Sequence, residues 1–343
     1  MRIAFVMEQT LGSVTHYLNL RREQSEAVRL EPLWVPIGFQ PSPLPWTVLG
    51  SIRARRAIAR VFDEVDGLFV HTNTIALASR RYFGSKPSIL STDGTPLNKK
   101  LMRHWYDLKQ QSTIAARAKQ LVQRSVFRSA AGFVAWSQWA KSSLVEDYGC
   151  RSEDIGIIPP GIDLTDFQPG ERKNALPRIL FVGGNFARKG GDLLLDVFRR
   201  RLRGRAELDL VTPAQLPAED GVRVHSSTKA NSPELKKLYA DCDVFALPTR
   251  ADCTPLAVME ALASGLPVVA TQVGGIPDLV RAGETGELVP RDDAERLGDA
   301  LEALVDSPAR RQQMGALARD DAGHRFDARS NARRLFEFVR SRL

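Results

Sequence analysis

Cysteine is scarce in this 343-residue sequence, and Cys150, Cys242 and Cys253 form no Cys-x-x-Cys pair. An odd number of scattered cysteines predicts reduced thiols in a cytoplasmic protein, and their spacing to the histidines does not resemble a zinc site. No run approaches the roughly 18 apolar residues that a membrane span needs, and the opening MRIAFVME lacks the features of a signal peptide. We therefore expect a globular protein without a membrane span.

Two common nucleotide-binding motifs are also missing. No Gly-x-Gly-x-x-Gly follows the first predicted strand, which argues against an NAD-dependent dehydrogenase. The glycine-rich segment 181–198 is not a Walker A loop, because no Gly-Lys-Ser/Thr follows its glycines. Any nucleotide site in this chain must therefore be built in another way.

Acidic residues are comparatively few in the first half of the chain. Residues 1–165 hold 21 Lys+Arg and 14 Asp+Glu, whereas the remainder holds 27 and 26, so the first half carries most of the net charge of +8. This surplus predicts contact with an anionic membrane surface or an anionic lipid-linked acceptor, whereas no motif indicates nucleic acid. The stretch 97–128 either touches such a partner or is a solvated helix; its basic residues are Lys99, Lys100, Arg103, Lys109, Arg117, Lys119, Arg124 and Arg128.

Apolar strand patterns alternate with helical patterns along the whole chain. The predicted strands of the first half are residues 2–6, 33–37, 67–71, 88–92, 132–137 and 155–161. The segment 159–177, rich in proline, glycine and charge, predicts a linker. After it, strands are predicted at 178–184, 206–212, 222–226, 243–249 and 267–271, and helices from 292 onward. This repetition predicts an α/β protein of two Rossmann-like halves with parallel sheets and a cleft between them.

One stretch, ADCTPLAVMEALASGLPVVATQVGGIPD, joins a helix start to a following apolar strand. Thr254 is a favourable N-cap, Pro255 suits the first helical position, and Gly265 suits the end of a helix of about ten residues. The free amides at its start belong mainly to Leu256 and Ala257. Unpaired amides and the positive end of the helix dipole predict a phosphate or diphosphate site.

Glu260 lies on the same face of that helix as Leu256, four residues on and roughly 6 Å further along the axis. This offset suits a carboxylate that binds the ribose hydroxyls of a nucleotide whose diphosphate lies at the helix start. An ordinary capped helix with a half-exposed glutamate is the structural alternative.

A second motif, FVGGNFARKGGDLLLDVF, occupies residues 181–198. Gly183 and Gly184 let the backbone approach a ligand closely, and Arg188 and Lys189 place two cations before the next helix. Alone, such a segment is equally consistent with a solvated loop. Across one sheet from the amides at 256–257, it predicts a two-sided diphosphate clamp and hence nucleotide binding.

These motifs resemble the C-terminal half of the family 4 retaining glycosyltransferases of the GT-B fold. The segments PGIDLTDF, VGGIPDLV, TGELVP and AWSQWAKSSLVEDYG also resemble that family, over roughly residues 130–295. The resemblance implies two Rossmann-like domains whose parallel sheets face each other across a cleft. Residues 1–165 would bind the acceptor and residues 166–325 the nucleotide-sugar donor. A last helix at about 326–343 would pack back on the first domain.

The resemblance also implies roles for individual residues. The family usually has two acids separated by seven residues, here Asp252 near the reacting sugar carbon and Glu260 on the ribose. Lys189 would neutralise the diphosphate. The implied catalytic residues are Asp93, Asp252 and Lys189, and the implied donor-binding residues are Gly12, Gly183, Gly184, Arg188, Lys189, Thr254, Pro255, Leu256, Ala257 and Glu260.

Two departures from the family pattern concern the same site. The first acid is usually glutamate, and Asp252 is one methylene shorter, so it is expected to alter the sugar contact or donor preference. An arginine often follows the first loop glycine, where this chain has Gly184.

In the N-terminal half, Gly12 follows strand one, where the family often has a Gly-Gly pair. Asp93, in STDGTP, stands where the family often has a histidine; it would polarise the acceptor or contact the donor sugar, or form an ordinary Asp-Gly turn. His16 and His71 lie near predicted strand ends, and for both a structural role is favoured.

The resemblance therefore implies transfer of a hexose-type sugar from a nucleotide diphosphate sugar to an acceptor hydroxyl, with retention and without a metal or other cofactor. The expected partners are the nucleotide sugar and a carbohydrate or lipid-linked acceptor in glycolipid or cell-surface polysaccharide synthesis, with peripheral contact to the inner face of the membrane. A nucleotide-sugar epimerase of the same fold and a non-catalytic sugar-nucleotide-binding protein are the alternatives.

Overall fold

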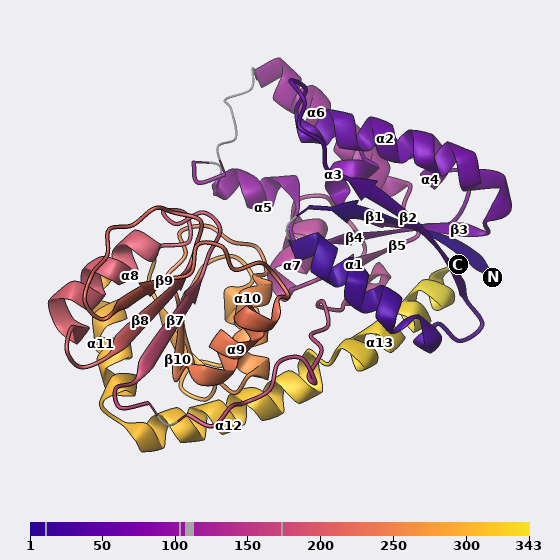
Figure 1. Ribbon diagram of the computed structural model, residues 1–343. Coiled ribbons are helices and arrows are strands. Elements are labelled where there is room, and N and C mark those ends of the chain that lie inside the picture. Colours follow the sequence, from indigo (N-terminus) through magenta and orange to yellow (C-terminus); the bar gives the residue numbers. More distant parts are fainter. Residues whose placement is uncertain (11, 103, 107–112, 173) are drawn as a thin grey trace. The chain divides into compact units, whose positions relative to one another are not determined.

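The structure is a computed structural model that describes residues 1–10, 12–102, 104–106, 113–172 and 174–343 (Figure 1). Contacts divide the chain into two compact units. The first unit comprises Met1–Leu101, Asp107–Gly161 and Ala328–Leu343, and the second comprises Met102–Tyr106 and Ile162–Asp327. Among the described residues no helix is long and apolar enough to cross a membrane.

The first unit contains a six-stranded parallel sheet. Its strands, in order across the sheet, are β2 (Glu31–Gly38), β1 (Arg2–Gln9), β3 (Gly67–His71), β4 (Ser88–Thr92), β5 (Gly132–Ala135) and β6 (Ile155–Ile157). Every residue of β3, β4 and β5 is buried. Continuous burial, rather than alternation, is expected because helices cover both faces of a parallel sheet.

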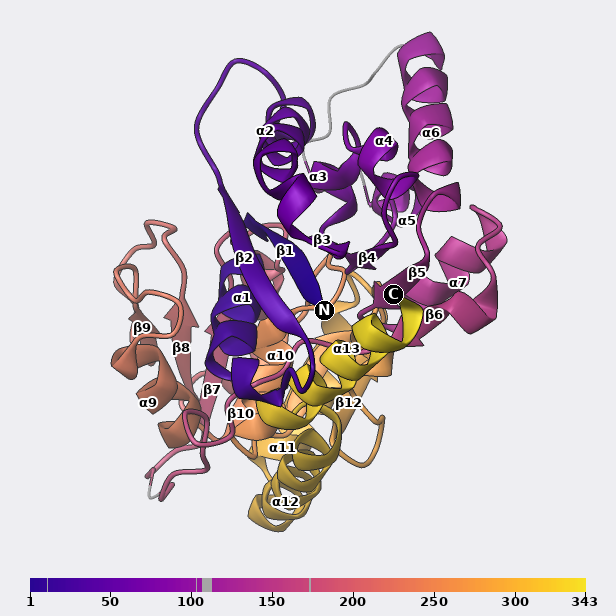
Figure 2. The same ribbon diagram turned by 90° about the vertical axis from the view of Figure 1, so that its right-hand side faces the viewer.

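Helices pack on both faces of this sheet (Figures 1 and 2). One face is covered by α2 (Trp46–Val61), α3 (Asn73–Ala76), α4 (Arg80–Phe83), α6 (Thr113–Arg128) and α7 (Gln138–Glu146), which share a core with Val70 and Leu90. The other face is covered by α1 (Gly12–Arg22) and the last helix, α13 (Ala328–Arg342). In that second core Phe336 of α13 lies edge-on against Phe5 of β1. A short helix, α5 (Pro96–Leu101), follows β4.

The second unit repeats this plan. Its parallel sheet has the order β12 (Gly286–Val289), β11 (Val268–Thr271), β10 (Val244–Leu247), β7 (Arg178–Val182), β8 (Glu207–Val211) and β9 (Val222–Val224). Its helices are α8 (Gly191–Val197), α9 (Pro233–Asp241), α10 (Leu256–Ala263), α11 (Ala294–Val305) and α12 (Pro308–Arg325). Figure 1 shows α8 and α11 on one side of the sheet and α9 and α10 on the other. One apolar core joins both layers to the strands.

The predicted fold class is confirmed, because both halves are doubly wound α/β units with parallel sheets. Three details differ from the sequence prediction. β12 was not among the predicted strands, and the helix predicted after β7 ends as an α-helix at Val197 and continues as a π turn, Phe198–Leu202. The basic stretch 97–128 contains two separate helices, α5 and α6. Of the residues named above, Arg103 and Lys109 lie outside the described part of the chain.

Candidate functional site

The loop between β7 and α8 in the second unit is shaped by two glycines that leave no room for a side chain. Gly190 has a φ of +76°, and a Cβ there would overlap the carbonyl oxygen of Pro248. At Gly183 a Cβ would come within 2.9 Å of the Lys189 Cβ. Gly184 is different, because an added Cβ would meet nothing within 4 Å. The loop is therefore folded tightly on β10 and open at Gly184.

Lys189 and Asp252 form an ion pair between the β7–α8 loop and the segment after β10. The Lys189 side chain is 14% exposed and that of Asp252 12%, so this pair is partly shielded from solvent. The backbone around Asp252 is fixed by Gly274, whose φ of +61° lets it lie against the Asp252 carbonyl, where a Cβ would overlap. Lys189, predicted to bind the diphosphate, and Asp252, predicted to bind the sugar, are thus in direct contact.

Two arginines connect the same segments. The Arg188 guanidinium donates to the carbonyl oxygen of Ala251 at 2.7 Å, and Arg250 bonds Asp192 at 2.6 Å and Asp292 at 2.5 Å. Arg250 is therefore neutralised by two carboxylates, whereas no carboxylate contacts the Arg188 guanidinium among the described residues. Arg188 carries the more available charge.

Aromatic rings from the segment Met102–Tyr106, which belongs to the second unit, cover both guanidiniums. Tyr106 lies 4.9 Å from Arg188, and Trp105 lies 4.9 Å from Arg250, both measured to the ring centroid. Cation–π contact of this kind holds a guanidinium in place without cancelling its charge.

The start of α10 differs from the prediction in its cap. Pro255 has an extended ψ of 120° and occupies the N-cap position, so the helix begins at Leu256 and has eight residues. The prediction that Thr254 caps this helix was wrong, because the turn starts one residue later than expected. The Thr254 hydroxyl is buried and has no hydrogen-bond partner among the described residues. Pro255 makes no side-chain cap hydrogen bond, and the first amides of a helix have no partner within the helix itself.

Glu260, in the second turn of α10, is buried. Its Oε2 accepts a hydrogen bond of 2.9 Å from the hydroxyl of Tyr239 on α9, and its Oε1 has no partner among the described residues. Burial raises the pKa of Glu260 to about 7, and the Tyr239 hydrogen bond acts in the opposite direction. The predicted alternative of a half-exposed glutamate does not apply.

Sequence reasoning missed Tyr239, which lies 21 residues before Glu260. Its ring is fully buried against Phe167 and Phe245, and only the packing of α9 beside α10 brings its hydroxyl to the carboxyl group. A tyrosine in an amphipathic helix carries no signal of this role in the sequence.

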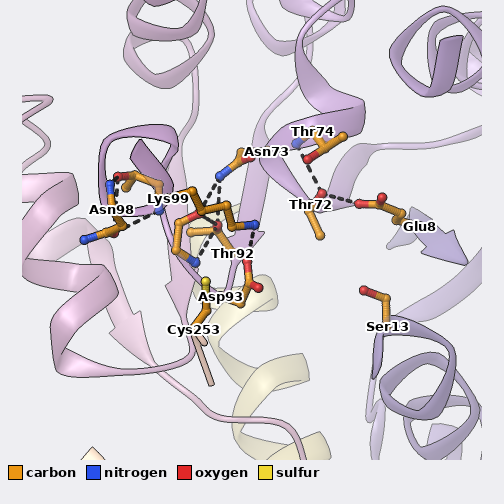
Figure 3. A network of polar contacts seen from close by, with 12 residues as sticks. Glu8, Ser13, Thr72, Asn73, Thr74, Thr92, Asp93, Asn98, Lys99 and Cys253 are labelled. Atoms are coloured by element: carbon orange, nitrogen blue, oxygen red, sulfur yellow. Dashed lines mark hydrogen bonds and ion pairs between the residues drawn. The ribbon is translucent and has the colours of Figure 1, made fainter. Parts of the chain in front are cut away.

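Buried polar groups also collect at the carboxyl ends of strands in the first unit (Figure 3). Glu8, the next-to-last residue of β1, accepts hydrogen bonds from the Thr72 hydroxyl and from the Trp46 indole, the latter at 2.5 Å. Asn73 donates to the Thr92 hydroxyl at 3.0 Å and to the Gly94 carbonyl at 2.8 Å. Glu8 was not predicted, although an acid at the end of an apolar strand was a usable signal.

Asp93 and Gly12, the two predicted residues of this half, lie near these groups along the chain. Asp93 follows β4 and forms an ion pair of 3.1 Å with Lys99 of α5 (Figure 3). Both side chains are partly exposed, at 27% and 28%. Gly12 is the first residue of α1, and the next residue, Ser13, has its hydroxyl 3.3 Å from the His71 Nε2. Asp93 is thus accessible and already paired with a cation.

His16 and His71 are both buried in the first unit and contact Trp136. His71 stacks on the Trp136 ring with centroids 5.0 Å apart, and His16 meets both rings edge-on at 5.1 Å. Burial lowers the pKa of His71 to about 3 and moves the pKa of His16 well below its usual value. Both rings are therefore neutral at physiological pH, as suits a packing role.

The structure pairs Lys189 of the glycine loop with Asp252, and α10, which begins at Leu256 and carries the buried Glu260, follows Asp252 in the same unit. The structure places Gly12 and Asp93 in the first unit. Within the described residues no group of three or more His, Cys, Asp or Glu side chains is arranged to hold a metal ion.

Two family profiles match the chain. Glycosyltransferase Family 4 matches residues 14–166, and Glycosyl transferases group 1 matches residues 176–307, so the two together cover both units. The chain belongs to the family 4 glycosyltransferases. The resemblance inferred from the glycine loop and the 252–260 acid pair is confirmed.

Curated relatives share about a third of the aligned residues. The MMP alpha-(1->4)-mannosyltransferase of Mycolicibacterium hassiacum is 30% identical over 63% of this chain and 53% of its own length. The D-inositol 3-phosphate glycosyltransferase 1 of Catenulispora acidiphila is 33% identical over 54% of this chain and 51% of its own length. The chain spans about half the length of these curated relatives.

Solved structures confirm the GT-B fold over the whole chain. Sucrose-phosphate synthase from Thermosynechococcus elongatus superposes with a TM-score of 0.79 at 17% identity, covering 99% of this chain and 98% of that one. Anabaena HepE in complex with UDP-glucose gives a TM-score of 0.76 at 17% identity, covering 99% and 100%. At this identity the likeness concerns the fold of this family 4 glycosyltransferase.

Proposed function

We propose that this protein transfers a hexose-type sugar from a nucleotide diphosphate sugar to an acceptor hydroxyl, with retention at the anomeric carbon. One observation carries the proposal: Lys189 of the glycine loop pairs with Asp252, which lies four residues before the first residue of α10, the helix that carries the buried Glu260. A cation, free amides and a carboxylate in this order along the site match the diphosphate and the ribose of such a donor.

The donor would bind through the second unit. Its diphosphate would lie against the amides of Leu256 and Ala257, with Lys189 and Arg188 balancing its charge, while Gly183 and Gly184 permit close approach of the loop backbone. Oε1 of Glu260, which has no partner among the described residues, would accept ribose hydroxyls while Tyr239 holds Oε2.

Asp252 would contact the sugar hydroxyls once the diphosphate has taken over its partner, Lys189. The ion pair thus keeps both the ammonium group and the carboxylate in position before the donor arrives. Thr254, whose buried hydroxyl has no partner among the described residues, would donate to a phosphate oxygen beside Pro255.

In the transfer itself, the bond from the anomeric carbon to the diphosphate oxygen breaks, and the leaving nucleoside diphosphate keeps the electron pair. Lys189, Arg188 and the helix amides stabilise that developing charge. The acceptor oxygen forms the new bond to the anomeric carbon, and its proton passes to the departing diphosphate oxygen. Asp93, in the first unit, would polarise the acceptor hydroxyl, and Gly12, at the start of α1, keeps its implied donor-binding role.

The comparisons support this proposal without naming the substrates. The Anabaena neighbour is described in complex with UDP-glucose and also with UDP, which favours a uridine diphosphate sugar as the first donor to test. The curated relatives are a mannosyltransferase and inositol phosphate glycosyltransferases. We propose that the acceptor is a carbohydrate or lipid-linked molecule of glycolipid or cell-surface polysaccharide synthesis, and that no metal or other cofactor is required, since cationic side chains and amides balance the diphosphate.

The proposal is tested by binding and turnover with UDP, GDP and ADP sugars. A thermal-shift screen identifies the base, and radiolabelled donor with an acceptor panel then measures transfer. We expect Glu260→Ala and Lys189→Ala each to lower kcat/KM by at least about a hundredfold, as loss of a charged contact in a shielded site does.

Matched control variants are Glu295→Ala and Lys237→Ala, which remove exposed side chains of the same kind from the same unit. Wild-type turnover in both Glu260→Ala and Lys189→Ala would refute the proposed site. Conversion of the donor sugar without an acceptor would indicate an epimerase instead.

A further inference from the structure

Helix α2 of the first unit carries a basic and apolar outer face that the proposed transfer site does not use. Residues 32–62 contain no aspartate or glutamate but four arginines, Arg53, Arg55, Arg56 and Arg60. The inner face of α2 packs on the unit through Gly50, Ser51, Ala54 and Ile58. The outer face is therefore available to a partner.

Large apolar side chains are exposed on this outer face and on the loop before it. Leu44 is 52% exposed, Val48 40% and Ile52 36%. These residues follow one another at intervals of four, so Val48 and Ile52 share one side of the helix, and Arg56 and Arg60 continue the same spacing. The result is a stripe that is apolar at the start of α2 and basic at its end.

The loop before α2 is held in place. Phe39, 54% exposed, rests on the Trp46 ring with centroids 5.2 Å apart, and the Trp46 indole donates to buried Glu8 at the end of β1. Prolines at positions 41, 43 and 45 restrict the backbone between them. Phe39 and Leu44 are therefore presented at the surface by a stiff segment, rather than exposed by chance in a flexible one.

The arginines of α2 differ from three exposed arginines of the second unit. Arg199, Arg200 and Arg205 each form ion pairs with carboxylates of their own unit. Among the described residues, Arg55, Arg56 and Arg60 are exposed and form no ion pair. Uncompensated positive charge beside exposed apolar side chains is the pattern of a surface that lies on an anionic membrane, with the apolar residues in the headgroup boundary and the arginines on phosphates.

We propose that the first unit binds an anionic phospholipid surface through the α2 face, defined as Phe39, Leu44, Val48, Ile52, Arg55, Arg56 and Arg60. Nucleic acid would match the arginines but gain nothing from four exposed apolar side chains, so the lipid surface is the partner that uses the whole face. This inference does not depend on the proposed reaction, because none of these residues belongs to the transfer site.

Co-sedimentation of the full chain with vesicles tests it. We expect binding to phosphatidylcholine vesicles that contain about one third phosphatidylglycerol and little binding to pure phosphatidylcholine. Arg55→Gln/Arg56→Gln/Arg60→Gln should weaken binding about a hundredfold, from about 1 kcal/mol per arginine at such a surface. Leu44→Ser/Ile52→Ser should weaken vesicle binding about tenfold and should abolish the binding that persists at high salt.

Two triple variants serve as controls. Arg199→Gln/Arg200→Gln/Arg205→Gln removes the same charge from the second unit and should bind vesicles like the wild type. Arg117→Gln/Lys119→Gln/Arg128→Gln removes three positive charges from α6, whose Leu121 and Val122 are also exposed. Circular dichroism and melting temperature confirm that each variant folds.

The proposal is overturned if the α2 variants bind like the wild type, if only the α6 variant loses binding, or if pure phosphatidylcholine binds equally well. If the protein instead binds double-stranded DNA with the affinity expected here for vesicles, and does not bind vesicles, the face would be assigned to nucleic acid.

Discussion

Glu260 is a carboxylic acid placed where water barely reaches it, and its environment determines its charge. In the folded protein its pKa is raised to about 7 from the usual 4.5 by burial, so the protonated form is favoured over a wide range of pH. Lys189 and Asp252 show the opposite arrangement, in which each charge is compensated by the other. A donor that supplies ribose hydroxyls and a diphosphate would satisfy both groups.

The pH dependence of stability should report on Glu260. Below pH 4.5 the group is protonated whether the chain is folded or not, and its contribution to stability is complete. Between pH 4.5 and 7 the unfolded chain releases its proton first, so this contribution falls as pH rises through the window. Glu260→Gln should therefore gain up to about 3 kcal/mol over wild type between about pH 5 and 8 in urea unfolding. Parallel pH profiles would contradict the burial of a titrating carboxyl group.

Gly184 stands where many members of the family have an arginine, and the space beside it is open. Gly184→Arg should therefore fold normally and add a cation to the loop. We expect about tenfold tighter binding of a nucleoside diphosphate by calorimetry, the size of a charged hydrogen bond. Gly184→Gln is the uncharged control; equal affinity in both variants would show that the position does not face the phosphates.

Which of these residue environments could be predicted depended on whether a sequence motif marks both partners. The Lys189–Asp252 contact joins residues 63 apart; the family resemblance implied that both bind one donor, Lys189 at the diphosphate and Asp252 at the sugar, but it did not predict their ion pair. The Tyr239 bond to Glu260 has no such signal. The prediction of the α10 cap failed for a local reason, because the backbone of Pro255 is extended and the first helical residue is Leu256.

At the scale of elements, short loops between strands and helices determine the shape of the site. The β7–α8 loop turns back on β10 through Gly190, with its amide bonded to the Ala187 carbonyl at 3.1 Å. β12 was missed because it is short and starts with Gly286, where a Cβ would overlap the Val268 carbonyl. A glycine selected for close approach resembles a turn residue in the sequence.

Two glycines with the same backbone conformation separate the cost of a positive φ from the cost of a close neighbouring atom. Gly190 and Gly204 have φ of +76° and +74°, but only the first meets a neighbour that leaves no room for a Cβ. Gly204→Ala should cost about 1 kcal/mol, the penalty for a left-handed alanine. Gly190→Ala should cost at least about 2 kcal/mol more and should reduce donor binding, because the loop must move away from Pro248. Equal costs in urea unfolding would contradict the tight contact.

For the molecule as a whole, the alternation of strands and helices was sufficient to predict two parallel α/β units, because both faces of each sheet are covered and most of the central strands are therefore apolar. The assignment of acceptor to one unit and donor to the other stays a prediction. What the alternation does not show is the path of the chain, in which α13 completes the core of the first unit.

Phe336→Ala tests that path. The side chain is 2% exposed in the first unit's core, so its loss should destabilise that unit by about 3–5 kcal/mol. Differential scanning calorimetry should show the unfolding transition of the first unit at a lower temperature. The transition of the second unit, recognised because a bound nucleoside diphosphate raises its temperature, should not change. Equal displacement of both transitions would mean that the units unfold together.

The ends of the main segment of the second unit have a consequence for how such enzymes can diversify. Ile162 and Asp327 are paired by a parallel bridge, and the Ile162 amide bonds the Phe326 carbonyl at 2.7 Å, so the segment begins and ends at one point. Because its ends adjoin, this segment can be exchanged as one piece. Recombination can replace residues 162–327 by the corresponding segment of a relative while α13 and the core of the first unit stay intact. If the second unit binds the donor, as proposed, such an exchange would replace the whole donor site in one step.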